Sequence, residues 1–184
     1  MVNIMYKIGI CGAHGTGKST LLEALHQELN LPVIKRTMRT LWENFGIDNF
    51  EKIPSDIRAN FQKYALLNQI DREDNEGKNG FISDRTVLDN LAYTKLNADM
   101  SQSDFRIYER LVRERLKNYT HFIYLPIEFE VKPEPLRADI GSRHQIAAII
   151  EDYLTKWFQA GTYLIARGSV EERVQQVKSF LQTN

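Results

Sequence analysis

The fold is decided by residues 7–29, which are KIGICGAHGTGKSTLLEALHQEL. This stretch begins with a short apolar run, Lys7–Cys11, and ends in an amphipathic run, Lys18–Leu29. Between them, Gly12–Ser19 fits the pattern G-x-x-x-x-G-K-[ST], in which backbone N–H groups converge on phosphate oxygens at a helix N-terminus. Phosphate binding by this pattern requires a strand before the loop and a helix after it. Both are present, so the sequence predicts a phosphate-binding loop.

The side chains of this loop have separate expected roles. Lys18 is expected to reach the β- and γ-phosphates of ATP, and the Ser19 hydroxyl to ligate Mg²⁺. His14 is at a variable loop position, where it hydrogen-bonds within the loop or faces solvent. The predicted nucleotide-binding residues are Gly12, Ala13, His14, Gly15, Thr16, Gly17, Lys18, Ser19 and Thr20.

Beyond the loop, short apolar runs alternate with longer helical patterns. This alternation predicts an α/β sandwich, in which a parallel sheet is covered by helices on both faces and ligands bind beyond the carboxyl ends of the strands. Strands are predicted at Lys7–Cys11, Pro32–Lys35, Gly80–Ser83, His121–Leu125 and Thr162–Ile165. Helices are predicted at Lys18–Leu29, Ser55–Asp74 with Ser55 as N-cap, Val87–Lys95, Ser103–Asn118, Arg143–Phe158 and Val170–Leu181.

Length and composition set broad limits. The 184 residues have no repeat, low-complexity tract or linker, which predicts a single domain over 1–184. Apolar residues make up 42% and charged residues 26%, as in ordinary globular chains, and the formal net charge is zero. A global positive field that attracts nucleic acid or membrane is therefore not expected. The single cysteine, Cys11, excludes an intrachain disulfide and favours a buried core residue.

No membrane span or signal peptide is recognised in the sequence. The longest apolar runs are far shorter than the roughly 18 residues that a spanning helix needs. The expected location is therefore the cytoplasm, without membrane partners.

Three further motifs carry a resemblance to a known family. They are Asp84-Arg85-Thr86 with Asp89-Asn90-Leu91-Ala92-Tyr93, the segment Pro135–Asp139 with Arg143, and Gly168 with Glu172-Arg173. With the phosphate loop they resemble the P-loop nucleoside and nucleoside monophosphate kinases. More closely, they resemble the ribosylnicotinamide kinase domain of bifunctional NAD-biosynthesis regulators and its single-domain relatives. The resemblance implies a three-layer sandwich with a five-stranded parallel sheet in the order 2-3-1-4-5, a helical lid at about 127–142, and phosphoryl transfer.

An acid and a base end the third predicted strand. A carboxylate at the ligand edge of the sheet accepts the proton of an attacking hydroxyl or holds Mg²⁺, so Asp84 is a candidate for both tasks. Arg85 is expected to clamp an acceptor phosphate or to balance charge on the transferring group. The family resemblance implies the general-base role for Asp84. The alternative is that Asp84 is the N-cap of the helix that begins near Val87.

Other arginines are assigned through the resemblance. In related kinases the segment corresponding to 127–142 is a lid whose arginines reach the phosphates on closure. Arg137 and Arg143 are therefore catalytic candidates, with Lys132 third, and a solvated loop is the alternative. Arg173, after the fifth strand, is expected near the adenine, and an ordinary turn and helix start is the alternative.

The acceptor region carries more positive charge than the resemblance leads us to expect. Arg36 and Arg39 follow the second strand, where the ribosylnicotinamide kinase pattern has an acidic residue. This basic pair favours an acceptor that carries phosphate. Four more cations share one helix face, but glutamates at pairing distance favour a solvated surface; they are Arg106, Arg110, Arg113 and Lys117.

These patterns support three hypotheses. The first is a kinase that uses ATP and Mg²⁺ to phosphorylate a nucleoside or nucleotide. The second is a kinase for a hydroxyl within DNA or RNA, either a strand end or a modified base such as a hydroxymethylated pyrimidine. The third is an ATPase or nucleotide-dependent switch, against which the lid-like segment and the Asp84-Arg85 pair argue. A homodimer is a further expectation.

Overall fold

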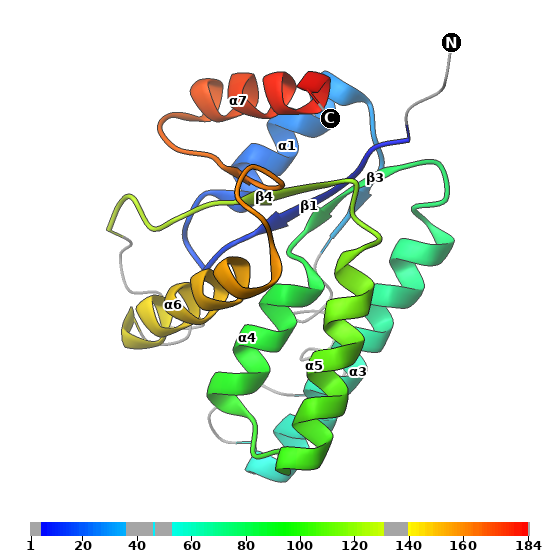
Figure 1. The fold of residues 1–184 in the computed structure, drawn as a ribbon, viewed down its shortest axis with the longest axis vertical. Helices are drawn as coiled ribbons and strands as arrows, with labels where there is room; N and C mark the ends of the chain where they lie inside the picture. The colour runs from blue at the N-terminus through cyan, green and yellow to red at the C-terminus, as the bar shows by residue number, and fades with distance from the viewer. Residues whose placement is uncertain (1–4, 36–45, 47–52, 131–139, 184) are drawn as a thin grey trace.

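The computed structural model of the protein describes residues 5–35, 46, 53–130 and 140–183. Within these residues, five parallel strands form one sheet in the order β2-β3-β1-β4-β5 (Figure 1). The strands are β1 (Lys7–Cys11), β2 (Val33–Ile34), β3 (Phe81–Asp84), β4 (His121–Tyr124) and β5 (Leu164–Ile165). The predicted fold class and strand order are confirmed.

Six helices are described around this sheet, and they form a layer on each face. The helices α1 (Lys18–Leu29) and α7 (Val170–Thr183) pack together on one face (Figure 1). The opposite layer holds α3 (Ser55–Asn75), α4 (Val87–Asn97), α5 (Gln102–Leu116) and α6 (Ile140–Trp157). In that layer α4 is central, since it contacts α3, α5 and α6.

The two layers correspond to two apolar cores. Ile8 and Ile10 of β1 belong to the core that includes Leu21 and Leu25 of α1. Cys11 belongs to the other core and is fully buried with a free thiol, as predicted. Because neighbouring side chains of a strand point to opposite faces, β1 anchors both layers and fixes the position of the loop that follows it.

The helix limits agree with the predictions within a few residues, but two local predictions are wrong. The helix α3 begins at Ser55 with Pro54 in the cap position, so Ser55 is not the N-cap. The helix α4 is capped by Thr86, whose side chain accepts a hydrogen bond from Leu88 N at 3.2 Å. The alternative reading of Asp84 as that cap is therefore also wrong, which leaves the Asp84 carboxylate available for other interactions.

Membrane insertion was not expected from the sequence. Over the residues that the structure describes, none of the helices combines the length and the apolar character that crossing a bilayer requires.

Candidate functional site

The loop between β1 and α1 has backbone conformations that favour glycine, two of them at Gly12 and Gly17. Gly12 has φ 149°, and a Cβ atom there would lie 2.5 Å from the carbonyl oxygen of Leu125. Gly17 has φ 86°, a left-handed conformation that side chains disfavour, and α1 begins at the next residue. Ser19 and Thr20 lie exposed in the first turn of α1. The loop thus brings backbone N–H groups and the positive end of a helix dipole to one place, which suits an anion.

Lys18 is buried inside this loop. Its side-chain ammonium donates hydrogen bonds to the carbonyl oxygen of Ala13 and, at 3.3 Å, to Oγ1 of Thr16. Burial, followed by the charge of Arg85, lowers the pKa of Lys18 to about 7. A nearby negative charge stabilises the protonated form of such a lysine and raises its pKa again.

Asp84 and Arg85 stand directly beside the loop. Asp84 pairs with Ile10 across β3 and β1, and the backbone N–H of Arg85 donates to the Ile10 carbonyl at 3.1 Å. The Asp84 carboxylate is half-buried and has no hydrogen bond or ion pair with any other residue that the structure describes. An uncommitted carboxylate at the carboxyl edge of the sheet, next to Lys18 and Arg85, is available to a ligand.

The Arg85 side chain is buried and points along α4. Its guanidinium carbon lies 4.8 Å from the centroid of the Tyr93 ring, and Nη1 lies 3.6 Å from Oδ1 of Asp89. In the described part of the chain Nη1 has no hydrogen-bond partner. A buried donor without a partner is costly, so this atom is suited to bind an anionic group of a ligand.

Asp89 has a role that sequence reasoning missed. The sequence placed Asp89 only in a motif of the family resemblance, but Asp89 is 1% exposed and joins two elements. One carboxylate oxygen accepts from Thr86 N at 2.8 Å and Thr86 Oγ1 at 2.9 Å, and the other accepts from Gly12 N at 3.2 Å. The start of α4 is therefore tied to the first residue of the loop. The spacing Thr86-x-x-Asp89, a capping-box pattern, was the available signal.

Two buried arginines hold the outer side of the loop. Arg143, in α6, donates to the carbonyl oxygens of His14 at 3.0 Å and Gly15 at 3.2 Å. Arg173, in α7, donates to the Thr16 carbonyl at 2.8 Å. The N–H and C=O groups of a trans peptide unit point in opposite directions. Because the two arginines hold these carbonyl groups, the N–H groups of the same peptide units point away from the arginines.

The same two arginines also bind the chain that leaves β4. Arg143 Nη2 donates to the Phe129 carbonyl at 2.9 Å, and Arg173 Nη2 pairs with Glu128 Oε2 at 2.7 Å. The sequence assigned Arg143 to the phosphates and Arg173 to the adenine, whereas here both guanidinium groups contact the loop backbone. Direct contacts with a nucleotide stay predictions for both residues.

Several predicted site residues fall outside the described part of the chain. They are Arg36 and Arg39 of the acceptor region, and Arg137 with Lys132 of the lid. Of the segment 127–142, the structure describes 127–130 and the first residues of α6. The lid and the roles of these cations stay predictions. His14 is described, and its Nδ1 lies 3.3 Å from the Tyr93 hydroxyl oxygen.

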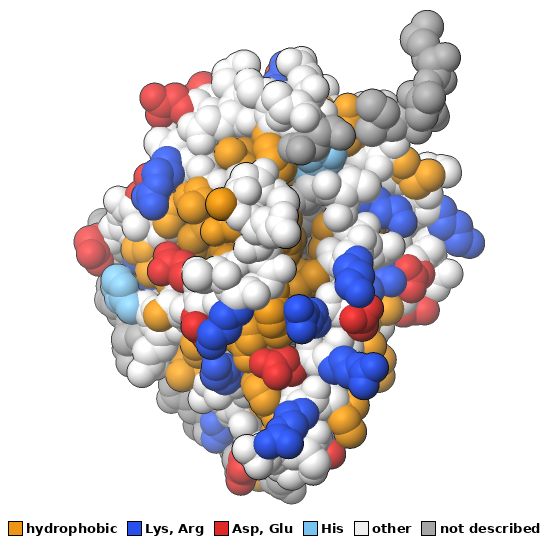
Figure 2. All heavy atoms as spheres, in the orientation of Figure 1, with side chains coloured by type: hydrophobic (Ala, Val, Ile, Leu, Met, Phe, Trp, Pro, Cys, Tyr) orange, Lys and Arg blue, Asp and Glu red, His pale blue; other side chains and the backbone are white. Residues whose placement is uncertain are grey.

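The basic stripe on α5 is a mixed-charge surface. Arg106, Arg110, Arg113 and Lys117 are exposed, as expected. Lys117 forms an ion pair with Glu114 at 2.6 Å, and nearby cations lower the pKa of the Glu114 carboxyl, Lys117 first. Figure 2 shows acidic side chains interspersed among the basic ones on this face. Such a surface is typical of a solvated helix rather than of a continuous track for a phosphate backbone.

Comparisons with known proteins agree with this geometry. The model of a family described as an AAA domain matches residues 7–173. A deoxyadenosine kinase of Dictyostelium discoideum is 27% identical over 132 residues, which is 69% of this chain and 52% of that protein. The chain thus spans about half the length of this curated relative.

Solved structures show the same fold. A deoxyadenosine kinase from M. mycoides superposes with a TM-score of 0.73 at 19% identity, covering 96% of this chain and 98% of that one. The NadR protein, solved with NAD and AMP-PNP, has a TM-score of 0.71 at 18% identity, covering 98% of this chain and 50% of that one. A thymidylate kinase from Ehrlichia chaffeensis has a TM-score of 0.66 at 13% identity, covering 97% and 99%.

The family match covers most of the sequence, including the phosphate loop, the Asp84-Arg85 pair and Arg143. The chain therefore belongs to the AAA domain family and has the fold of the P-loop nucleoside and nucleotide kinases.

Proposed function

We propose that this protein is a kinase that transfers the γ-phosphoryl group of ATP, with Mg²⁺, to a hydroxyl group of a nucleoside or nucleotide. The observation that carries the proposal is the position of Asp84 and Arg85 beside Lys18, across the carboxyl ends of β1 and β3. A protein that only hydrolyses ATP or switches between states needs the phosphate loop and an acid near Mg²⁺, but it does not need an acceptor site beside them. The similarity to deoxyadenosine kinases gives independent support.

The residues of the loop suit ATP and Mg²⁺. A Cβ atom at Gly12 would clash with the Leu125 carbonyl oxygen, and one at Gly17 with Arg173 Nη1, so glycine lets the loop pack closely against its neighbours. Lys18 is a buried cation within this loop. The exposed Ser19 hydroxyl and the Asp84 carboxylate are hard oxygen ligands of the kind that Mg²⁺ prefers. Among the described residues no cluster of three or more acidic, His or Cys side chains could hold a metal. This fits an ion bound mainly through phosphates and water.

When bound, ATP supplies the phosphoryl group, and Mg²⁺ neutralises charge on its oxygens. The protein residues have distinct tasks. Lys18 binds phosphate oxygens, and the Asp84 carboxylate orients the acceptor hydroxyl and accepts its proton. Arg85 presents Nη1, which lacks a hydrogen bond among the described residues, to an anionic oxygen of the donor or the acceptor. Arg143 and Arg173 keep the loop carbonyls turned away from the ligand.

The domain and lid proposals follow from the same fold. We take 1–184 as one kinase domain with a lid at about 127–142, because Glu128 and Phe129 are fixed to arginines at the base of this segment. Closure of a segment anchored in this way would exclude water from the phosphates. Arg137 and Lys132 would then bring positive charge to the site.

The test is transfer of label from γ-labelled ATP to a panel of nucleosides, nucleoside monophosphates, ribosylnicotinamide and short oligonucleotides. Label in one small-molecule class, lost in Lys18→Ala and Asp84→Asn, is the expected result. Transfer to oligonucleotides with a strong dependence on salt would select the nucleic-acid alternative instead. Release of inorganic phosphate alone, unchanged in Asp84→Asn, would leave an ATPase or switch.

A further inference from the structure

Arg85 has an unusual backbone conformation. Two non-glycine residues have positive φ in the described part of the chain, Asn30 at 52° and Arg85 at 81°. Asn30 follows the last turn of α1, where the left-handed conformation is common. Arg85 has no such local reason, and the conformation costs about 1–2 kcal/mol for a residue with a side chain. Strain of this kind persists only where surrounding contacts impose it.

Both peptide groups of Arg85 are held by other elements. Its N–H donates to the Ile10 carbonyl of β1 at 3.1 Å. Its carbonyl oxygen accepts a hydrogen bond from Nε2 of Gln69, in α3, at 3.1 Å. The first hydrogen bond continues the ladder between β1 and β3, and bonds of this kind occur at the ends of ordinary strands. The second comes from a side chain and is particular to this site.

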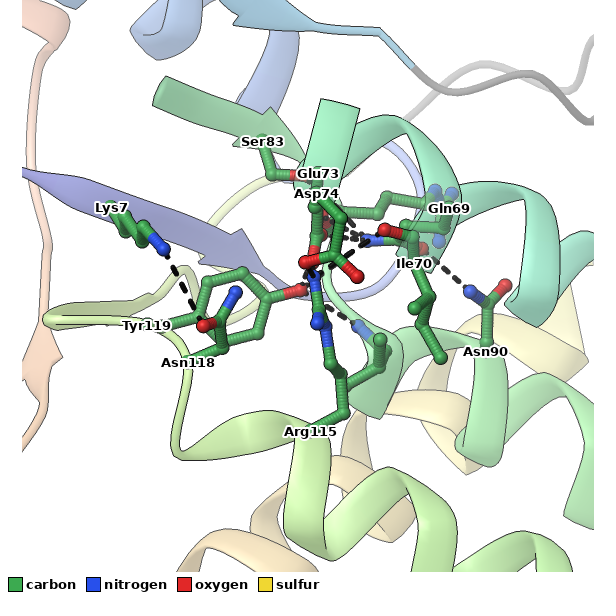
Figure 3. A network of polar contacts seen from close by, with 12 residues as sticks. Lys7, Gln69, Ile70, Glu73, Asp74, Ser83, Asn90, Arg115, Asn118 and Tyr119 are labelled. Carbon is green, nitrogen blue, oxygen red and sulfur yellow. Dashed lines mark hydrogen bonds and ion pairs between the residues drawn. The ribbon is translucent and has the colours of Figure 1, made fainter. Parts of the chain in front are cut away.

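The Gln69 amide is itself fixed in orientation, as Figure 3 shows. Nε2 donates to Glu73 Oε1 at 2.9 Å, and Oε1 accepts from Asn90 Nδ2 at 2.6 Å. Reversing the amide would place its oxygen against the Glu73 carboxylate and the Arg85 carbonyl, which are both acceptors. The hydrogen bond to Arg85 therefore follows from the positions of Glu73 and Asn90.

Glu73 is the buried centre of this network. It is 1% exposed, and its Oε1 also accepts from the Tyr119 hydroxyl at 2.7 Å. Oε2 lies 3.4 Å from Nη2 of Arg115, a side chain that reaches inward from α5. Figure 3 shows Gln69, Glu73, Arg115 and Tyr119 turned toward one another. In a buried network of this kind the position of each group depends on the others.

We infer that Gln69 is a positioning residue that keeps Arg85 in its left-handed conformation and so aims the Arg85 guanidinium at the ligand site. The inference rests on the proposed function for its kinetic consequences, but not for its structural ones. Glu73 and Asn90 hold Gln69, and Gln69 holds the carbonyl of Arg85. The guanidinium then lies over Tyr93, with Nη1 3.6 Å from Asp89 Oδ1 and without a hydrogen bond among the described residues. In this role Gln69 acts through Arg85 and not through a contact of its own with ATP or the acceptor.

The first test is structural and needs no activity. Crystal structures of the parent and of Gln69→Met, which keeps the side-chain volume but has no amide, are compared at Arg85. In the variant we expect φ of Arg85 to leave the left-handed region and the guanidinium to move away from Tyr93. A variant in which both stay as in the parent would overturn the inference. Asn90→Ala removes only the outer tether and serves if Gln69→Met does not fold; it is expected to shift the guanidinium in the same direction.

The second test is a double-mutant cycle in the phosphoryl-transfer assay. Gln69→Met should lower kcat by on the order of 10–100-fold, while the KM for ATP changes less than about threefold. In an Arg85→Ala background the same substitution should cost less than about threefold, because the group through which it acts is gone. Equal losses in both backgrounds would mean a merely structural role. Gln27→Met, at an exposed glutamine of α1, is the matched control and should match the parent.

Failure of the proposed function is recognised separately. A parent protein that transfers no label to any acceptor would refute the kinase proposal, and the crystal structures would still decide the role of Gln69. Conversely, an active parent with an unmoved Arg85 in Gln69→Met would refute only the positioning role.

Discussion

Binding of ATP with Mg²⁺ at about pH 8 should draw a proton from solution, and Lys18 is the group that receives it. In the structure this side chain is 5% exposed. Burial lowers its pKa from 10.5 to about 7, with the charge of Arg85 as the second cause. Phosphate oxygens beside the ammonium favour its charged form, which returns the pKa toward its ordinary range.

The magnitude follows from the two pKa values. With a pKa of about 7 in the free protein, about nine-tenths of Lys18 is neutral at about pH 8, so binding should take up about 0.9 of a proton. The sign is fixed, since the pKa is lower in the free protein than in the complex. Affinity for ATP is therefore independent of this group below about pH 7 and falls above it, by at most about tenfold per pH unit.

Isothermal titration calorimetry in buffers of different ionisation enthalpy measures this proton directly. At about pH 8 the phosphates of ATP, with a second pKa near 6, contribute little of their own. Lys18→Arg, whose guanidinium keeps its proton, should bind without uptake. Lys156→Met, at an exposed lysine of α6, should keep the uptake of the parent. Binding by the parent with no proton uptake, or uptake that survives in Lys18→Arg, would refute the reasoning.

Three further predictions concern the frame of the loop. Asp89→Asn should lower the free energy of unfolding by about 1–3 kcal/mol, because an amide cannot accept from all three donors that the carboxylate serves. A urea denaturation curve that matches the parent would contradict this loss of stability. Arg143→Met should raise the KM for ATP by about tenfold or more, because its charged hydrogen bonds to the loop carbonyls are lost. Arg167→Met, at an exposed residue, should leave the KM for ATP unchanged. Equal KM values in the two variants would contradict the bracing role of Arg143. Gly12→Ala should lower the melting temperature more than Gly161→Ala. Both residues have positive φ, but of the two only Gly12 lacks space for a Cβ atom. Equal shifts in melting temperature would mean that the close approach of Leu125 O to Gly12 does not matter.

The sheet and most helix limits could be predicted because local patterns determine them. The phosphate loop fixes the end of β1 and the start of α1, and both elements agree with the prediction residue for residue. Short apolar runs between helices located the remaining strands to within two residues at either end. Such patterns depend only on residues that are close in sequence, so they can be read from one sequence alone.

The inner face of α3 could not be predicted from hydrophobic spacing. Ile57 and Tyr64 recur at helical spacing, yet each is 49% exposed. The buried side of this helix carries Gln62 at 2% and Glu73 at 1% exposure beside apolar residues such as Phe61 and Leu66. Counting apolar residues locates only part of the buried face when a helix buries polar groups beside apolar ones.

The supporting contacts of the site could not be predicted for a related reason. Arg143 and Arg173 act on backbone carbonyls of a loop more than 100 residues away in sequence, and no sequence motif encodes such a contact. Gln69 is held by groups from α3 and α4 and binds the residue that follows β3. By contrast, local patterns in the sequence indicated Lys18, which belongs to the phosphate loop, and Asp84 and Arg85, which stand at the end of a recognisable strand.

The central claim is that Asp84 and Lys18 form a site that sends phosphate to an acceptor rather than to water. The most direct test follows label from γ-labelled ATP with and without a saturating nucleoside or nucleotide acceptor, in the parent and in Asp84→Asn. The account predicts that most label reaches the acceptor in the parent, with turnover on the order of 1–100 s⁻¹, and that Asp84→Asn loses this transfer while it still binds ATP. Label that appears only as inorganic phosphate, at the same rate with and without acceptor and in both proteins, would contradict the account.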